Sequence, residues 1–266
     1  MERLVLSGFA CSEESWIDFL GPETTVMSFA DVLQATRSSD IRDWGTWAAS
    51  ELLRIRPDSI VCHDFGGVLG LHALAIMKPS EWERHACLSI LNTAFRDFNV
   101  FKNPHPLLVQ ASTWGFITRL IRAQGGSVDD NLKPFFPLIK KAYRRTAVLS
   151  LARQIQKRIH PDRKAGRPLQ MSAQIIASPS DPFIAMETIR GIERDFKVPI
   201  FHTMDYGHFP YASANRDAVR RLIYDFEASS LHEHTRMQTQ TQVISDGSSP
   251  EFFNDAPIRS GAPLHP

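Results

Sequence analysis

The stretch Ile60-Val61-Cys62-His63-Asp64-Phe65-Gly66-Gly67-Val68-Leu69-Gly70 decides how this chain is organised. The apolar run at residues 59–62 predicts a buried strand, and the apolar-periodic run that begins at Val68 predicts a helix. Between the two, Gly66 and Gly67 lack a Cβ, so a helix can pack close to the strand while the turn residue adopts a strained backbone conformation. The stretch therefore predicts a strand, a sharp turn and a helix, with the carboxylate of Asp64 at the apex.

Strand and helix signals alternate on both sides of this turn. Amphipathic helices are expected at residues 41–54, 183–196 and 215–226. Buried strands are expected at residues 3–7, 24–29, 59–62, 86–91, 171–177 and 198–204. This alternation predicts an α/β fold with a mostly parallel sheet flanked by helices. Ligands of such sheets bind beyond the carboxyl ends of the strands.

The alternation is interrupted once. Between residues 95 and 167, helical patterns broken by proline and glycine predict a helical cap inserted into the core. The core is then formed by residues 1–94 and 168–229. From residue 230 the composition turns to Thr, Gln, Ser, Gly, Pro and His without periodicity, so residues 230–266 are expected to be a disordered tail.

Composition limits the class of protein. The chain has 266 residues, is 43% hydrophobic and carries a formal net charge of +1, which favours a large buried core and no overall attraction to nucleic acid or membrane. Its three cysteines have no disulfide-framework spacing, which favours a reducing cytoplasm. No stretch approaches the roughly 20 apolar residues of a membrane span, and the first apolar run is too short for a signal peptide. We expect a cytoplasmic protein that acts on a small molecule.

Three chemically active side chains each follow the end of a predicted strand. Because the carboxyl ends of parallel strands meet at one edge of a sheet, Asp64, Asp181 and His208 are expected to converge there. No His, Cys, Asp or Glu cluster has metal-ligand spacing, so no metal is expected. No cofactor is expected either, since the Gly66-Gly67 pair lacks the Lys-Ser/Thr that completes a phosphate-binding loop.

Four segments, spread over residues 3–226, resemble the signature motifs of α/β-hydrolase-fold proteins and occur in the order of that family. They are Ser7-Gly8-Phe9-Ala10 with Trp16, Cys62-His63-Asp64-Phe65-Gly66-Gly67, Ser178-Pro179-Ser180-Asp181-Pro182 and Gly207-His208-Phe209-Pro210. The elbow around Asp64 most resembles the Gly-His-Asp-Trp-Gly-Gly of epoxide hydrolases and haloalkane dehalogenases, whose nucleophile is an aspartate. The resemblance implies a catalytic triad of Asp64, Asp181 and His208.

The chemistry implied by this resemblance has two steps. The Asp64 carboxylate attacks an sp3 carbon that bears an epoxide oxygen or a halide, and an alkyl ester forms. His208, oriented by Asp181, then activates the water that hydrolyses the ester. The backbone N–H groups of Phe9 and Phe65 would form the oxyanion hole of this second step.

The residues around the leaving group depart from those relatives. The epoxide hydrolases use two cap tyrosines, whereas the cap of this chain holds only Tyr143. The dehalogenases place a Trp after the nucleophile, where this chain has Phe65; Trp114 and Asn92 are then the candidates for a partial halide site. The first loop, Ser7-Gly8-Phe9-Ala10-Cys11, is more similar to the esterase branch, which includes pimeloyl carrier-protein methyl esterase.

Two alternative functions remain open from the sequence. One is a carboxylester or thioester hydrolase, or a lyase, in which Asp64 acts as a base or positions water. The other is a catalytically silent member of the fold that binds a small apolar ligand. An enzyme would lose activity on Asp64→Asn and His208→Gln, whereas a binding protein would keep its ligand affinity.

The end of the predicted cap is strongly basic. Its cationic residues are Lys133, Lys140, Lys141, Arg144, Arg145, Arg153, Lys157, Arg158, Arg163, Lys164 and Arg167, against Asp162 alone. A solvated helical face explains such a run. The other interpretation is a surface that steers an anionic partner, such as an acyl carrier protein, a coenzyme A thioester or an anionic substrate.

Overall fold

A six-stranded sheet organises the computed structural model, which describes residues 1–8, 11–82, 85–93, 113–138, 140 and 171–245. The strands are β1 (Arg3–Leu6), β2 (Thr24–Met27), β3 (Ser59–His63), β4 (Cys87–Leu91), β5 (Ser172–Ala177) and β6 (Ile200–Thr203). Their spatial order is β2-β1-β3-β4-β5-β6, and every neighbouring pair is parallel. The predicted parallel sheet is therefore confirmed.

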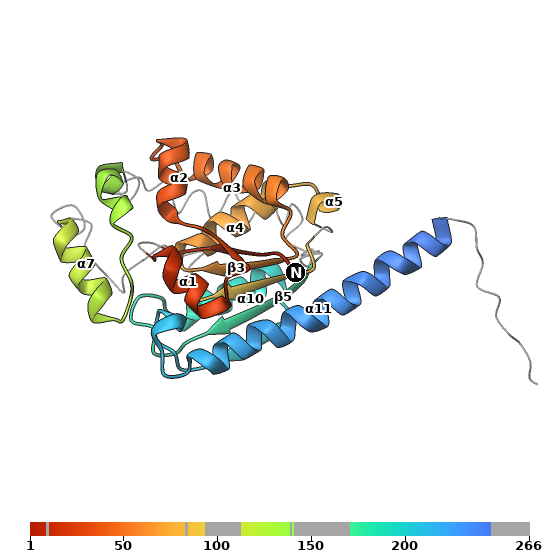
Figure 1. Cartoon of the computed structure of the whole chain (residues 1–266). Coiled ribbons are helices and arrows are strands. Elements are labelled where there is room, and N and C mark those ends of the chain that lie inside the picture. The colour runs from red at the N-terminus through yellow and green to blue at the C-terminus, as the bar shows by residue number, and fades with distance from the viewer. Residues whose placement is uncertain (9–10, 83–84, 94–112, 139, 141–170, 246–266) are drawn as a thin grey trace, which may run out of the picture. The chain divides into compact units, whose positions relative to one another are not determined.

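Helices cover both faces of this sheet. They are α1 (Glu13–Leu20), α2 (Phe29–Thr36), α3 (Ile41–Ile55), α4 (Phe65–Ile76), α5 (Pro79–Trp82), α7 (Trp114–Ala123), α10 (Met186–Phe196) and α11 (Arg216–Ser245), with short 3-10 turns η1 (Asp130–Phe135) and η2 (Pro210–Ala212). Figure 1 shows α3 and α4 on one face of the sheet, and α1 with the first part of α11 on the other. Every residue of β1, β3 and β4 is buried, as expected for strands covered on both faces.

The turn after β2 differs from the expected boundary. The apolar pattern predicts a strand through residue 29, but Phe29 is the first residue of α2. The reason is a capping box at Ser28, whose side chain accepts a hydrogen bond from the Asp31 N–H while the Asp31 carboxylate accepts one from the Ser28 N–H. This local polar pair ends the strand, and the apolar pattern does not reveal it.

The helix α11 continues to Ser245, past residue 230, where the disordered tail is expected to start. No glycine or proline interrupts the sequence between residue 230 and Gly247, and Leu, Glu, Arg, Met and Gln in this part favour a helix. The chain divides into a unit of residues 1–231 and a second unit of residues 232–266. Within the second unit, residues 246–266 lie outside the described part.

A buried ion pair joins the first strand to the last helix. Arg3 donates from Nε to Glu227 Oε1 at 2.7 Å and from Nη2 to Oε2 at 2.5 Å. Ser59 donates to the same Oε1 at 2.7 Å, and the Arg3 guanidinium also donates to the carbonyl of Leu20 at 2.8 Å. The side chains of Arg3 and Glu227 are 8% and 0% exposed. This two-bond geometry holds α11 against β1 and β3.

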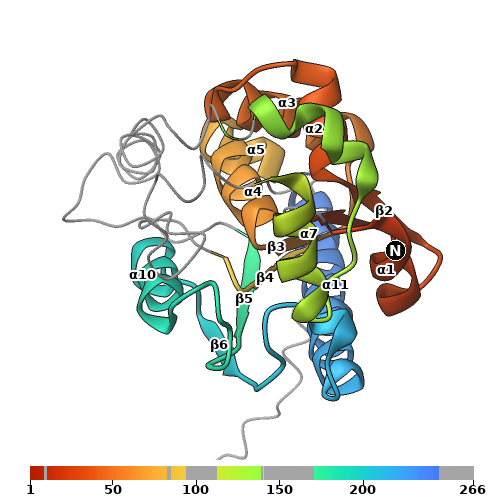
Figure 2. The ribbon, with the colours of Figure 1, turned by 90° about the vertical axis from the view of Figure 1, so that its left-hand side faces the viewer.

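The described part of the predicted cap is helical. It consists of α7 and η1, which lie beyond the carboxyl ends of the strands (Figures 1 and 2). Thr113 caps α7 by accepting from the Phe116 N–H, and the Ser127 hydroxyl accepts from the Ser12 N–H of the core at 3.1 Å. The rest of residues 95–167 lies outside the described residues, so the extent of the cap stays a prediction.

Candidate active site

Asp64 occupies a strained turn between β3 and α4. Its backbone angles are φ 49° and ψ −119°, a conformation that non-glycine residues rarely adopt. Its N–H donates to the carbonyl of Leu91 at 3.2 Å, which extends the ladder between β3 and β4. A Cβ on Gly66 would lie 2.0 Å from the carbonyl oxygen of Leu6, so only glycine fits this close approach. The elbow therefore forms as predicted, with a carboxylate at its apex.

A histidine and a second carboxylate meet beyond β5 and β6. His208 Nδ1 donates to Asp181 Oδ2 at 2.8 Å. The other oxygen of Asp181 accepts from the N–H groups of Phe183 at 2.7 Å and Ile184 at 3.0 Å, so the carboxylate is held from both sides. Asp205, the other acid near this histidine in sequence, instead accepts from the Ser180 hydroxyl. Asp181 is thus the carboxylate that orients the His208 ring.

The pKa of His208 results from opposing effects. Burial of the ring lowers the pKa, but the hydrogen bond and charge of Asp181 and the charge of Asp64 outweigh it, so the pKa lies above 6.5. That Asp64 contributes here means that its carboxylate lies within electrostatic reach of the imidazole. Asp64, Asp181 and His208 are 7%, 1% and 6% exposed, respectively. The structure brings these three predicted residues into one buried site.

Aromatic rings surround the imidazole. Phe183 and Phe209 contact His208 in T-shaped arrangements, with ring centroids 4.8 and 4.7 Å apart. The Phe65 ring lies on the elbow itself and packs against Phe29 at 4.6 Å and Trp44 at 5.6 Å. The described surroundings of the site are therefore mainly apolar, which favours an apolar ligand.

Asn92 occupies a different position from the one expected of a halide contact. It is fully buried, and its Nδ2 donates to the carbonyls of Gly207 at 2.7 Å and His208 at 3.4 Å. Its Oδ1 accepts from the Ser178 N–H at 2.9 Å. The amide nitrogen is directed to main-chain oxygens, so this side chain holds the acid loop and the histidine loop together rather than facing a leaving group.

The remaining candidates are placed as follows. Phe65 begins α4, so its backbone N–H follows Asp64 directly. Trp114 is half-buried and packs against Phe136 with ring centroids 5.6 Å apart. Phe9 and Tyr143 lie outside the described residues. The oxyanion and leaving-group roles of these four residues stay predictions.

The predicted basic surface is mostly outside the described part of the chain. Of its residues, only Lys133 and Lys140 are described: Lys133 is exposed, and the ammonium of Lys140 lies 5.4 Å from the ring centre of Phe136. An anionic partner at this surface therefore remains a proposal.

His63, directly before the apex, also takes part in the site. Its Nε2 donates to the carbonyl oxygen of His208 at 2.9 Å, and its ring lies 4.9 Å from the His208 ring. A Cβ on Gly8 would lie 2.8 Å from His63 Nδ1 and 2.9 Å from Asp64 Oδ2, so the first loop packs tightly on both side chains. The sequence offers only the position of this histidine next to Asp64 as a signal.

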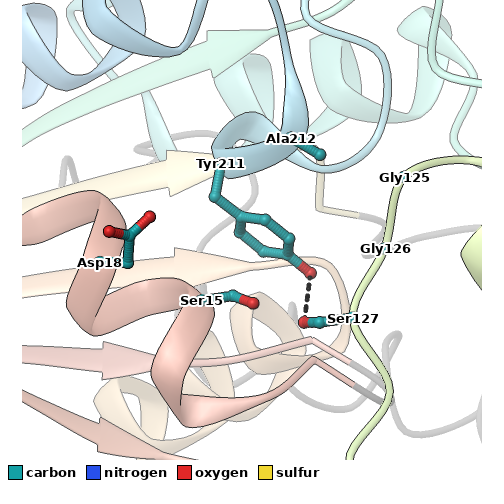
Figure 3. A pocket seen from close by; sticks show the side chains of 7 residues that line it. All are labelled: Ser15, Asp18, Gly125, Gly126, Ser127, Tyr211 and Ala212. Atoms are coloured by element: carbon teal, nitrogen blue, oxygen red, sulfur yellow. Dashed lines mark hydrogen bonds between the residues drawn. The ribbon is translucent and has the colours of Figure 1, made fainter.

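A surface pocket lies beside η2, the turn that follows the histidine loop. Its volume is about 310 Å³, and Figure 3 shows its lining residues, which are Ser15, Asp18, Gly125, Gly126, Ser127, Tyr211 and Ala212. Ser127 donates to the Tyr211 hydroxyl at 3.3 Å, and Tyr211 packs against Trp16, which in turn contacts His63. None of Asp64, Asp181 and His208 lines this pocket.

Other chemistries find little support in the described residues. Burial raises the pKa of the Cys11 thiol to about 12, so it is not poised to act as a thiolate. No group of His, Cys, Asp and Glu side chains within the described ranges is arranged to hold a metal ion. Among the described helices, none combines the length and apolarity needed to cross a membrane.

Comparison with known proteins identifies the fold. The sequence matches no protein-family model, and no curated protein is similar to it at the sequence level. Solved structures do match, with identities that support a shared fold only. The RedJ thioesterase from the prodiginine pathway of Streptomyces coelicolor is 15% identical, with a TM-score of 0.56 over 85% of this chain and 89% of that one.

Two further structures give the same result. An α/β-hydrolase-fold protein from Burkholderia ambifaria is 15% identical, with a TM-score of 0.51 over 84% of this chain and 89% of its own. A mutant of a candidate epoxide hydrolase from Pseudomonas aeruginosa is 16% identical, with a TM-score of 0.50 over 88% of this chain and 90% of its own. The chain therefore has the α/β-hydrolase fold.

Proposed function

We propose that this protein is a hydrolase that opens an epoxide through a covalent ester on Asp64. One observation carries the proposal: the side chain at the strained elbow is a carboxylate, and it lies within electrostatic reach of a histidine that is already paired with a second carboxylate. A buried carboxylate at this position is a nucleophile for carbon, and the His208–Asp181 pair is suited to activating water.

In the first step, an Asp64 oxygen attacks an epoxide carbon as the carbon–oxygen bond of the ring breaks. Helix α4 begins at Phe65, and the dipole of this helix stabilises the negative charge of Asp64 before the attack. The departing alkoxide needs a proton, and Tyr143 is our candidate donor. The product of this step is a hydroxyalkyl ester of Asp64.

In the second step, His208 Nε2 takes a proton from water while Nδ1 remains bonded to Asp181. The hydroxide attacks the ester carbonyl of Asp64, and the backbone N–H of Phe65 stabilises the resulting oxyanion. The ester bond breaks, the imidazolium of His208 returns its proton to the departing oxygen, and a diol leaves. The carboxylic acid of Asp64 then returns the borrowed proton to Tyr143.

We favour an epoxide over a halide because of the N–H donors near Asp64. A halide is held by N–H donors, and the ring next to Asp64 is that of Phe65, which has none. The nearby Trp44 donates its Nε1–H to the carbonyl of Ser38 at 2.9 Å. Asn92 uses its amide on main-chain carbonyls. Trp114, which packs against Phe136, is the remaining candidate for a halide contact.

Ester hydrolysis with Asp64 as the nucleophile is chemically unfavourable, because it would pass through a mixed anhydride. Solved structures of similar fold include thioesterases as well as a candidate epoxide hydrolase, so a hydrolase is the common expectation. The carboxylate at the elbow is what directs the proposal to attack on an sp3 carbon.

The test is the intact mass of His208→Gln after exposure to a panel of epoxides, haloalkanes and activated esters. Without the base, the ester on Asp64 should accumulate, with a mass gain equal to the opened epoxide. Peptide mapping should place the adduct on Asp64, and Asp64→Asn should remain unmodified. If the unaltered protein hydrolyses esters and His208→Gln gains no mass with any compound of the panel, Asp64 is not the nucleophile.

A further inference from the structure

One side chain connects the elbow directly to the histidine loop. His63 is the last residue of β3 and is covalently followed by Asp64, while its Nε2 reaches the carbonyl oxygen of His208 at 2.9 Å. The His63 side chain is fully buried, with the Trp16 ring at 5.3 Å and the His208 ring at 4.9 Å. His63 is thus bonded to both residues of the proposed reaction: to Asp64 through the peptide bond and to the His208 backbone through a hydrogen bond.

The geometry fixes the protonation state of this ring. A carbonyl oxygen can only accept, so His63 Nε2 carries a proton, and Nδ1 faces the Cys11 sulfur at 3.8 Å as an acceptor for the thiol proton. Burial and the nearby His208 lower the pKa of His63 to about 4, against opposing effects of Asp64 and Asp181. His63 therefore stays neutral, with one fixed donor, over the range in which His208 titrates.

We propose that His63 is a positioning residue for the hydrolysis of the covalent intermediate, because its hydrogen bond to the His208 carbonyl sets the distance between the general base and the ester on Asp64. This inference rests on the proposed function. Alkylation of Asp64 does not use His208, whereas hydrolysis requires it within reach of a water that lies on the ester. Displacement of a general base by about 1 Å can cost roughly a hundredfold in rate.

Asn92 does not replace this bond. Its Nδ2 is 3.4 Å from the His208 carbonyl but 2.7 Å from that of Gly207, which is therefore its main acceptor. His63 is the closer donor to the His208 carbonyl, at 2.9 Å. Loss of His63 leaves a buried carbonyl with one long contact, and the histidine loop is free to shift to satisfy it.

The chain offers a matched control. His85 is also a buried histidine, and its Nδ1 donates to a backbone carbonyl, that of Pro57, at 2.7 Å. Pro57 precedes β3, so this bond lies at the opposite end of the strand from Asp64. Replacement of His85 removes the same kind of hydrogen bond at a distance from the site. A comparison of the two variants therefore separates a loss of protein stability from a loss of His208 positioning.

The experiment compares His63→Leu, which removes the donor, His63→Gln, which retains one, and the control His85→Leu. Quenched-flow mass spectrometry with an epoxide substrate gives the rates of adduct formation and adduct hydrolysis. NMR of the proton on His208 Nδ1 reports the environment of the His208 ring without any substrate, and thermal melting reports stability.

We expect His63→Leu to slow adduct hydrolysis by about 10- to 100-fold while adduct formation changes less than about threefold. His63→Gln should recover most of the hydrolysis rate. The Nδ1 proton signal of His208 should shift in His63→Leu but not in His85→Leu, even where the two variants melt at similar temperatures.

A folded His63→Leu that hydrolyses the adduct at the normal rate with an unshifted Nδ1 proton would overturn the inference. Equal slowing of both steps, matched by His85→Leu, would also overturn it by showing a general loss of stability. If the proposed function itself is wrong, the result is different, because His208→Gln then accumulates no covalent adduct. In that case the shift of the Nδ1 proton alone decides whether His63 positions His208.

Discussion

Asp181 and His208, which lie 27 residues apart in sequence, form a hydrogen bond of 2.8 Å that is closed to solvent. The second oxygen of this carboxylate accepts from the backbone N–H groups of Phe183 and Ile184, so Asp181 cannot turn away from the imidazole without losing both bonds. Its role in the proposed hydrolysis is to hold the imidazole in one orientation and to stabilise the imidazolium.

Asp181→Asn should therefore lower kcat by about 100-fold or more, because the amide cannot stabilise the positive charge that forms on His208. The measurement is steady-state turnover of an epoxide identified by the adduct experiment. Asp205→Asn is the matched control: Asp205 pairs with Ser180, so its loss should change kcat little. Equal loss in both variants would contradict the assignment.

The pKa of His208 should fall when the charge of Asp64 is removed. In the unaltered protein it should titrate above 6.5, because Asp181 and Asp64 outweigh the effect of burial. Asp64→Asn removes one of the raising charges, so His208 should titrate at a lower pH in an NMR titration of its ring protons. An identical titration in both proteins would show that the Asp64 carboxylate does not act on this imidazole.

The hydrolysis of the adduct should depend on pH through His208. A protonated His208 cannot accept a proton from water, so adduct hydrolysis should fall as the pH falls through its pKa. Esterification removes the negative charge of Asp64, a charge that raises the pKa of His208 in the free protein. The fall in the hydrolysis rate should therefore occur at a lower pH than the titration of His208 in the free protein. Rates of adduct decay at a series of pH values provide the measurement.

Gly66→Ala should destabilise the protein by about 3 kcal/mol, because the new Cβ would lie 2.0 Å from the backbone oxygen of Leu6 and cannot be relieved by a rotamer change. The control is Gly115→Ala in α7, where nothing lies within 4 Å of the added Cβ. That change should stabilise slightly, by about 0.5 kcal/mol. Urea denaturation of both variants decides.

Glu227→Gln should lower the free energy of unfolding by about 3 kcal/mol, because it leaves the buried guanidinium of Arg3 without its counter-ion. Urea denaturation measures the loss. The exposed pair Arg54–Glu51, in which the arginine side chain is 68% exposed, provides the control, and Glu51→Gln should have little effect. A small effect of Glu227→Gln would mean that water reaches Arg3 after the substitution.

The sheet and the elbow are predictable from the sequence because both depend on local patterns. Apolar runs bounded by glycine and polar residues indicate the strands, and the Asp64-Phe65-Gly66-Gly67 turn indicates the sharp reversal. The proximity of Asp181 and His208 also follows, since both lie just past adjacent parallel strands, β5 and β6. The prediction of these features requires only the periodicity of apolar residues and the geometry of a parallel sheet.

Contacts to backbone carbonyls could not be predicted in the same way. The acceptors of His63 and Asn92 are main-chain oxygens of His208 and Gly207, and a carbonyl has no sequence signature. The length of α11 escapes prediction as well, because helix propensity spread over polar residues is not visible as an apolar period. Hydrogen bonds to backbone groups that are distant in sequence, and helices that depend on the propensity of polar residues, are therefore the features that the sequence does not predict.

The pairing of Arg3 with Glu227 also constrains the order of events during synthesis. The ribosome adds Glu227 to the chain 224 residues after Arg3. Until then the arginine has no buried counter-ion, and the first residues of β1 and β3, where Arg3 and Ser59 lie, favour a hydrated, open state. Docking of α11 therefore comes late in the folding of the domain, and a chain truncated before Glu227 should be more exposed to proteolysis.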